Sequence, residues 1–193
     1  ELDAAAVAAS SGAYRTCAAC HGANGMGNVA LQAPALVNLD TDYMERQIHH
    51  FRSGVRGRHP DDRWGQQMSD QAELLADDQA VAAVVAQIDS FPDQAPATRI
   101  EADLERGMAL YNMTCGSCHG PGAEGNPAFN APSLRGIDDW YLVRQYQNFR
   151  DGVRGTHEDD ALGIQMQRMG QVLKNEQDIQ AVSAWIASLD VDA

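Results

Sequence analysis

The chain has 193 residues, of which 27 are acidic and 14 basic, for a formal net charge of −13. This length suits two compact units of about a hundred residues better than one small domain. The acidic excess argues against nucleic acid as a partner, and the sequence holds no apolar run of about 18 residues that would span a membrane.

The amino terminus carries neither a basic nor an apolar targeting segment, so we expect that an export signal has been removed before Glu1. Residues 3–15 are expected to form a short helix that leads into the first pair of cysteines.

A pentapeptide of two cysteines and a histidine follows this helix. Cys17, Cys20 and His21 form a Cys-x-x-Cys-His motif, which is typical of c-type haem attachment. In such a motif the two thiols bond to the haem and the histidine becomes the proximal ligand of the iron. A zinc site and a disulfide are the alternatives. Zinc would need a fourth ligand, and no further histidine lies nearby in the sequence.

The next segments predict a loop and two helices. Residues 21–39 hold Gly, Pro and Asn without an apolar period, and Pro34 would fix a turn whose carbonyl accepts the second N–H of His21. Helical spacing predicts a central helix through Met44, Ile48, Phe51 and Val55, and a closing helix through Val81, Val84, Val85 and Ile88. No alternating strand pattern appears, so the predicted fold class is all-α.

Met68 lies in the polar segment between these two helices, at the end of a Gly-x-Gln-Met sequence. We expect it to be the distal iron ligand, because the same Gly-x-Gln-Met sequence recurs in register in the second half of the chain. The distal residue decides the function, since a saturated iron transfers electrons whereas an open iron binds small ligands. His59, in the same segment, is the rival ligand. Asp61 and Asp62 are expected to be solvated loop acids, since no further oxygen ligands cluster there to form a calcium site.

Adding 98 to a residue number maps the first half onto the second without a gap, from the first haem cysteine almost to the end. The mapping predicts a second haem motif at Cys115, Cys118 and His119, a second turn at Pro132, a distal ligand at Met166, a rival at His157 and loop acids at Asp159 and Asp160. A second entering helix is expected over residues 101–113. Before the cysteines the register slips, because Tyr14 precedes Cys17 by three residues whereas Tyr111 precedes Cys115 by four.

Repeated polar residues are candidates to bind the haem propionates. They are Tyr43, Gln47, Arg52 and Arg56 in the first half and Tyr141, Gln145, Arg150 and Arg154 in the second. Between the halves, residues 91–98 contain two prolines and no apolar period, which predicts an extended linker. The expected domains are therefore 1–95 and 96–193.

These motifs resemble tandem class I cytochromes c, and the layout is similar to that of the di-haem cytochrome c4 type. The resemblance covers essentially the whole chain. It implies two cytochrome c domains related by pseudo-twofold symmetry, each with one covalently attached haem c. It also implies the ligand pairs His21 with Met68 and His119 with Met166. The segment that precedes each methionine is longer than the corresponding cytochrome c4 loop and resembles domains associated with respiratory complexes.

The resemblance implies a periplasmic electron-transfer protein, not an enzyme, whose partners are redox proteins such as a terminal oxidase, a reductase or a dehydrogenase. Docking onto a basic partner surface, or adaptation to salt, would account for the acidic charge. The alternatives are a di-haem oxidoreductase of peroxidase or thiosulfate dehydrogenase type, and a cytochrome module of a larger respiratory complex. Thiosulfate enzymes of this layout use a cysteine as a distal ligand, and every cysteine here belongs to a haem motif.

Overall fold

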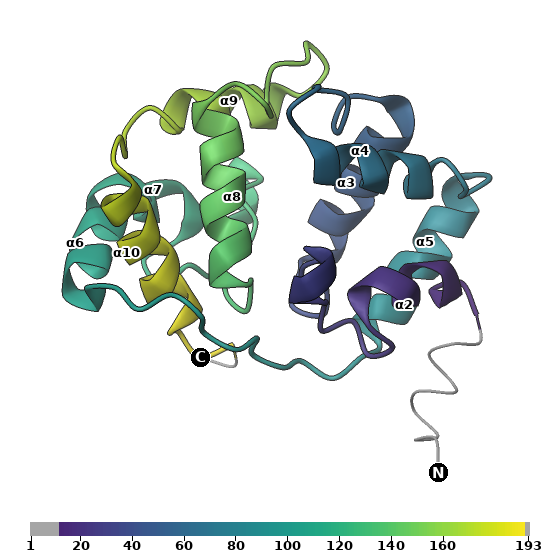
Figure 1. The fold of residues 1–193 in the computed structure, drawn as a ribbon, viewed down its shortest axis with the longest axis horizontal. Helices are drawn as coiled ribbons and strands as arrows, with labels where there is room; N and C mark the ends of the chain where they lie inside the picture. Colours follow the sequence, from purple (N-terminus) through teal and green to yellow (C-terminus); the bar gives the residue numbers. More distant parts are fainter. Residues whose placement is uncertain (1–11, 192–193) are drawn as a thin grey trace. The chain divides into compact units, whose positions relative to one another are not determined.

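A computed structural model of the chain describes residues 12–191. Within this range every regular element is a helix, as Figure 1 shows, and the all-α prediction is confirmed. The chain divides into two compact units, with the division between Gln94 and Ala95, and we refer to them as unit 1 and unit 2.

Unit 1 contains the elements α2 (Arg15–His21), η1 (Val29–Leu31), α3 (Thr41–Ser53), α4 (Arg63–Ala72) and α5 (Asp78–Asp89). The predicted central and closing helices are confirmed as α3 and α5, although Val55 falls in the turn beyond α3. Residues 3–11 of the predicted entering helix lie outside the described residues. Residues 12–14 form a turn, and the described helix begins at Arg15.

Unit 2 repeats this order as α6 (Leu104–Thr114), α7 (Gly116–His119), η2 (Pro127–Phe129), α8 (Asp139–Arg150), α9 (Ala161–Met169) and α10 (Glu176–Ala187). The second entering helix, predicted over residues 101–113, is confirmed as α6. It stops just before the haem motif, and the short α7 then carries the second cysteine and the histidine of that motif.

The helices α4 and α9 were not predicted from the sequence. They are short and contain several polar residues, and most of the residues they bury are small, such as Gly65, Ser69 and Ala72 in α4 and Gly163 in α9, so their helical pattern is weak in the sequence. Met68 and Met166 therefore lie on helices rather than in loops.

The expectation that Asp62 and Asp160 are solvated loop acids is wrong. Each is buried, and each side chain begins a helix by accepting a hydrogen bond from the backbone N–H of a glycine, at 2.9 Å from Gly65 and 2.8 Å from Gly163. A carboxylate at this position satisfies one of the free N–H groups of the first helical turn and opposes the helix dipole. Asp61 and Asp159 do lie exposed.

Each unit has its own apolar core around the closing helix. In unit 1 the core consists of Tyr14, Met44, Val81, Val84, Val85 and Ile88. In unit 2 it consists of Tyr111, Ala123, Leu173, Ile179, Val182 and Ile186. The closing helix packs against the central helix in both units, and α10 also packs against α6. These cores are small, so a bound haem would add a large share of each unit's buried apolar surface.

The predicted linker is held at both ends. Within unit 1, the Asn38 side-chain amide donates to the Gln94 carbonyl at 2.9 Å. Within unit 2, the buried Asp139 carboxylate accepts from the backbone N–H groups of Arg99 and Ile100 at 2.6 and 2.8 Å. Residues 95–98 lie between these two anchors.

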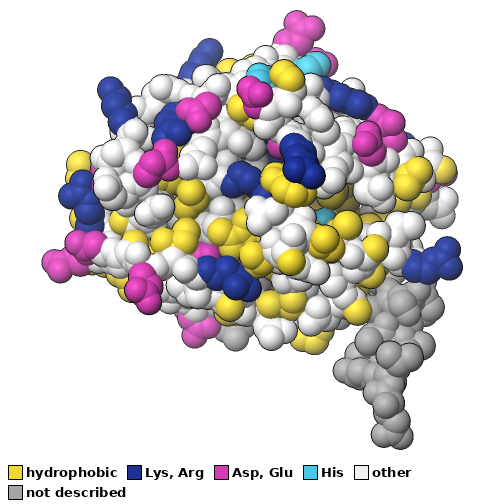
Figure 2. All heavy atoms as spheres, viewed as in Figure 1, with side chains coloured by type: hydrophobic (Ala, Val, Ile, Leu, Met, Phe, Trp, Pro, Cys, Tyr) yellow, Lys and Arg dark blue, Asp and Glu magenta, His cyan; other side chains and the backbone are white. Residues whose placement is uncertain are grey.

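The surface carries charges of both signs. On the face shown in Figure 2, acidic and basic side chains are interspersed rather than gathered into one block. Among residues 12–191 no helix has the length and apolar character that a bilayer crossing requires.

Candidate haem sites

Each proximal histidine is buried and oriented by a proline carbonyl. Nδ1 of His21 lies 2.8 Å from the carbonyl oxygen of Pro34, and Nδ1 of His119 lies 2.8 Å from that of Pro132. A carbonyl only accepts, so Nδ1 must carry the proton and Nε2 keeps its lone pair for a metal. Burial lowers the pKa of both histidines, which favours this neutral form. The predicted orienting contact is confirmed in both units.

Glycine allows the proline segment to come this close. Gly27 has a φ of 76°, and a Cβ placed on it would lie 2.6 Å from the backbone of Pro34 and Ala35. Its N–H donates to the His21 carbonyl at 2.8 Å. Gly125 repeats this arrangement, with a φ of 85° and the same contact to the His119 carbonyl. A side chain at either position would push the proline carbonyl away from the imidazole.

No disulfide joins the two cysteines of either motif. Burial raises the pKa of the thiols of Cys17 and Cys115. Among residues 12–191, no group of three or more His, Cys, Asp or Glu side chains gathers to hold a metal ion.

A buried tyrosine supports each motif, and sequence reasoning did not assign it a role. The hydroxyl groups of Tyr14 and Tyr111 donate to the carbonyls of Gly22 and Gly120, each at 2.8 Å. Both side chains are fully buried, and this burial raises the pKa of both phenols. The two tyrosines therefore make the same hydrogen bond in both units. Adding 98 to a residue number does not reveal this, because the register slips before the cysteines.

A buried contact fixes the helix that carries each predicted distal methionine. A Cβ on Gly65 would lie 2.0 Å from Oδ2 of Asp62, and a Cβ on Gly57, whose φ is 83°, would lie 2.3 Å from the Gly65 carbonyl. Unit 2 repeats these contacts. A Cβ on Gly163 would lie 2.0 Å from Oδ2 of Asp160, and a Cβ on Gly155 would lie 2.2 Å from the Gly163 carbonyl. The glycine of each Gly-x-Gln-Met sequence is thus required by its capping aspartate. Met68 and Met166 are half-buried on these helices.

The rival ligands His59 and His157 lie in the turn that precedes each methionine helix. Nδ1 of each accepts a hydrogen bond from the backbone N–H two residues later, at 3.2 Å. Their side chains are 35 % and 40 % exposed. Each histidine thus has a structural role in its turn.

The candidate propionate ligands separate into two groups. Arg56 and Arg154 are buried, and the Nη1 of each donates to the side-chain oxygen of Gln47 or Gln145 at 2.8 Å. Each guanidinium also lies 4.4 Å from the ring centre of a phenylalanine. Arg52 and Arg150 instead pair with Asp78 and Glu176, at the start of the closing helices, at 3.1 and 2.9 Å. The second pair ties helices together at the surface.

These residues fit a covalently bound haem. Each site combines two thiols with a buried imidazole whose Nε2 is available for iron. In unit 2, Nε1 of Trp140 is also buried and has no hydrogen-bond partner within residues 12–191. A buried indole N–H without an acceptor is costly, and the carboxylate of a haem propionate would supply one.

Comparisons with known proteins place the chain in a family. The family model described as cytochrome c matches residues 7–91 and 104–190. A thiosulfate dehydrogenase electron acceptor from Stutzerimonas stutzeri is 32% identical over 187 residues, which cover 92% of this chain and 80% of that protein. Cytochrome c4 from Azotobacter vinelandii is 29% identical over 195 residues, which cover 94% of this chain and 88% of that protein.

A solved structure supports the same assignment. The thiosulfate dehydrogenase TsdBA from Marichromatium purpuratum, in its as-isolated form, superposes with a TM-score of 0.71 at 30% identity. The match covers 92% of this chain and only 37% of that longer chain. The chain therefore belongs to the cytochrome c family, with two tandem cytochrome c domains that each bind a covalent haem c, and it is similar to the di-haem cytochrome c4 electron carriers.

Proposed function

We propose that this chain is a periplasmic di-haem electron carrier in which both irons are saturated. The haems are held through Cys17, Cys20, Cys115 and Cys118, and the axial ligands are His21 with Met68 and His119 with Met166. When bound, each haem supplies one reversible electron at its iron. The residues of the chain orient the imidazole, hold the thioether and exclude water.

The observation that carries this proposal is the identity of the two ligand environments. Both histidines use the same proline contact at 2.8 Å. Both methionine helices use the same contact between a capping aspartate and a glycine. An enzyme needs one iron with an open position, and its two sites would differ in the parts that hold the distal ligand. Here the contact that orients the histidine and the aspartate–glycine contact that begins the methionine helix are the same in both units.

Optical spectroscopy tests the ligand assignment. The oxidised protein is expected to show the sulfur-to-iron band near the red edge of the visible spectrum, with a contribution from each haem. Met68→Ala and Met166→Ala should each remove about half of the band, because each removes one of two thioethers. Met169→Leu, on an exposed methionine three residues after Met166, is the matched control and should leave the band intact. A wild-type band from one haem only would contradict the assignment.

We further propose that a thiosulfate dehydrogenase is the electron donor. The support is the similarity to a protein named as the electron acceptor of such an enzyme, over most of both chains. The alternative, that this chain itself oxidises thiosulfate, gains no support from its cysteines, because all four belong to the haem motifs.

Stopped-flow mixing separates these roles. Thiosulfate together with a thiosulfate dehydrogenase should reduce both haems, and thiosulfate alone should reduce neither. With a net charge of −13, the rate of the enzyme-dependent reaction should fall as salt rises if the partner surface is basic. Reduction by thiosulfate alone would make the chain an oxidoreductase. No reduction in either case would exclude this donor and leave the carrier assignment to the spectroscopic test.

The periplasmic location rests on where covalent haem attachment occurs in known c-type cytochromes. Fractionation of cells that produce the protein checks it, because the haem-stained band should appear in the periplasmic fraction. Haem-loaded protein found only in the cytoplasm would contradict the proposed location.

A further inference from the structure

The carboxyl ends of the central helices α3 and α8 face the helices that carry the predicted distal methionines. The last turn of any α-helix leaves carbonyl groups without a partner inside the helix. In both units, side chains near the methionine bind these carbonyls. The residues that do so differ between the units.

In unit 1 the contact is made beside the methionine. Ser69 follows Met68 directly and is fully buried. Its hydroxyl donates to the Phe51 carbonyl at 2.7 Å, and the Arg56 carbonyl lies 3.3 Å from the same oxygen. Because Ser69 and Met68 share a turn of α4, this hydrogen bond fixes the position of the methionine backbone against α3.

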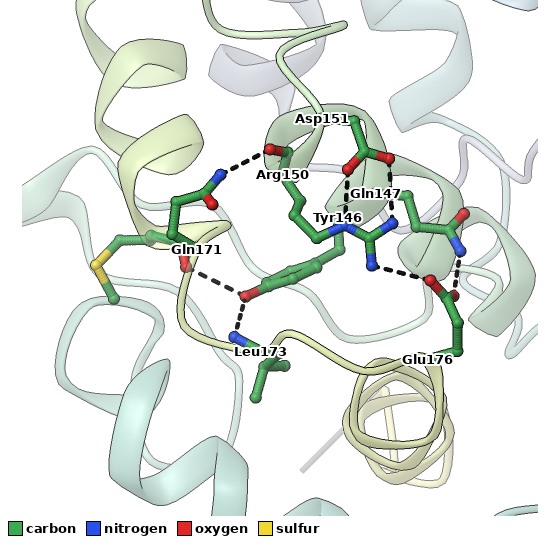
Figure 3. Close-up of polar contacts among 8 residues, drawn as sticks. Tyr146, Gln147, Arg150, Asp151, Gln171, Leu173 and Glu176 are labelled. Carbon is green, nitrogen blue, oxygen red and sulfur yellow. Dashed lines mark hydrogen bonds and ion pairs between the residues drawn. The ribbon is translucent and has the colours of Figure 1, made fainter.

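In unit 2 the contact is made beyond the methionine. Gln167 stands in the place of Ser69 and makes no side-chain hydrogen bond within the described residues. Instead, the Gln171 amide donates to the Arg150 carbonyl at 2.6 Å. The Tyr146 hydroxyl, on α8, donates to the Met169 carbonyl at 3.1 Å and accepts from the Leu173 N–H at 2.9 Å. Figure 3 shows Tyr146 lying between these two groups.

These contacts have no counterpart in unit 1. The residue aligned with Tyr146 is Ile48, which has no polar side-chain atom. The residue aligned with Gln171 is Glu73, which pairs with Arg58. Each unit thus holds its methionine helix with its own set of hydrogen bonds, and the two sets share no residue.

We propose that Ser69 and Tyr146 are positioning residues, each of which holds one methionine helix against its central helix and so sets how readily that methionine is displaced from iron. The proposal rests on the assignment of Met68 and Met166 as ligands. When a methionine leaves the iron together with its helix, that motion breaks the hydrogen bond. Since the two sets of contacts are separate, a change in one unit leaves the other haem unaffected.

Imidazole, a small ligand that competes with methionine for ferric iron, tests the proposal. Its binding to each haem is followed through the hyperfine-shifted methyl signals of the two ligand methionines in the oxidised protein. Met68→Ala and Met166→Ala assign these signals. Ser69→Ala should tighten imidazole binding at the first haem by about tenfold, the equivalent of one net hydrogen bond, and leave the second unchanged. Tyr146→Phe should do the reverse, so each variant is the control for the other.

Two further variants separate positioning from stability. Gln171→Ala alters an exposed side chain and should also loosen the second methionine, which protects the test if Tyr146→Phe folds poorly. Ala184→Gly destabilises the middle of α10 through helix propensity and touches none of these hydrogen bonds. It should lower the melting temperature without changing imidazole binding.

The outcomes are distinct from those of the proposed function. A wild-type protein without two methionine methyl signals would overturn the ligand assignment itself. Two such signals with unchanged imidazole affinities in Ser69→Ala and Tyr146→Phe would overturn the positioning role alone. Equal changes at both haems in either variant would also contradict it, because they would report a general loss of stability.

Discussion

Unit 1 and unit 2 orient their proximal histidines through the same hydrogen bond, but they pack different aromatic side chains against the tyrosine that supports each haem motif. In unit 1, Tyr14 meets Phe91 edge to face, with ring centres 5.2 Å apart. In unit 2, Tyr111 tilts against Trp185 at 4.6 Å. Phe91 follows the closing helix, whereas Trp185 lies within it. The hydrogen bond that orients each proximal histidine is the same in both units, and the aromatic packing of the supporting tyrosine differs.

The register slip before the cysteines illustrates this separation. The Tyr14 carbonyl accepts from the N–H groups of Cys17 and Ala18 at 2.9 and 3.0 Å, so one continuous helix reaches the histidine. In unit 2 the Tyr111 carbonyl accepts from Cys115 at 2.8 Å, and α7 starts anew after that residue. Unit 2 has one more residue between the tyrosine and the first cysteine, and the helix is interrupted at Cys115. The Tyr111 hydroxyl still donates to the Gly120 carbonyl.

The haem loops differ in the same manner. Gly25 of unit 1 has a φ of 73°, and a Cβ there would lie 2.7 Å from Cγ1 of Val37. Unit 2 has Ala123 at a φ of 60°, fully buried, and Arg135 in the place of Val37. The Arg135 side chain turns to the Gly122 carbonyl at 2.6 Å. Unit 2 therefore has a larger residue at position 123, and the side chain of its neighbour Arg135 is directed to the Gly122 carbonyl.

Loss of one haem should produce the largest difference in stability between the two units. The double variant Cys115→Ala/Cys118→Ala should retain haem in unit 1 only, because attachment uses the thiols of each motif separately. Unit 2 then lacks the apolar surface of its cofactor and should not fold stably, since domain stability is only about 5–15 kcal/mol. Calorimetry and haem absorbance check this result. A unit 2 that melts as in the wild type would show that its protein core suffices.

Exchanging the loop residues should produce an asymmetric effect. Gly25→Ala should destabilise unit 1 by about 1–3 kcal/mol, because it combines left-handed strain with a close contact to Val37. Ala123→Gly should cost less in unit 2, since relief of strain offsets the lost methyl group. Denaturant unfolding followed at each haem measures both changes. Gly25→Ala/Val37→Ala should recover part of the loss, and a double variant no better than the single would refute the clash.

The smallest expected difference between the units is the pH dependence of their stability. A hydrogen bond from Arg106 at 2.5 Å holds the pKa of Asp178 below its usual value, and unit 1 has Ala80 in this position. The contribution of this pair is present above the unfolded-state pKa of about 3.9 and is lost as the pH falls through the lower folded-state value. Asp178→Asn should therefore lower the melting temperature of unit 2 slightly at pH 7, with the difference shrinking toward pH 3. A pH-independent difference would contradict this origin.

Sequence patterns were sufficient for the parts of the molecule that follow simple periods or motifs. The haem pentapeptides needed only residue identity, and α3 and α5 were visible as helical apolar spacing. The role of Pro34 and Pro132 followed from the need of an axial histidine for a second hydrogen bond. The repeat also led to Met68 and Met166 as the predicted distal ligands, because equal spacing in both halves indicates a shared requirement, and this assignment stays a prediction.

Other features were hidden because their signals are not apolar. The helices α4 and α9 are short and contain several polar residues, and they bury small residues, so their helical pattern is weak in the sequence. The burial of Asp62 and Asp160 depends on a glycine three residues later, a capping pattern that single-residue polarity does not reveal. The hydrogen bonds of Ser69 and Tyr146 join segments 18 to 27 residues apart, so only the folded chain brings them together.

The anchored linker has a consequence for proteolysis. A protease requires several residues of extended, accessible chain, and residues 95–98 are the stretch between the Asn38 and Asp139 anchors. Each anchor joins residues of one unit only. A cut within this stretch would therefore leave Gln94 bound to Asn38 and Arg99 bound to Asp139. Limited digestion should place the two haem motifs on different fragments, one ending near Gln94 and the other beginning near Arg99.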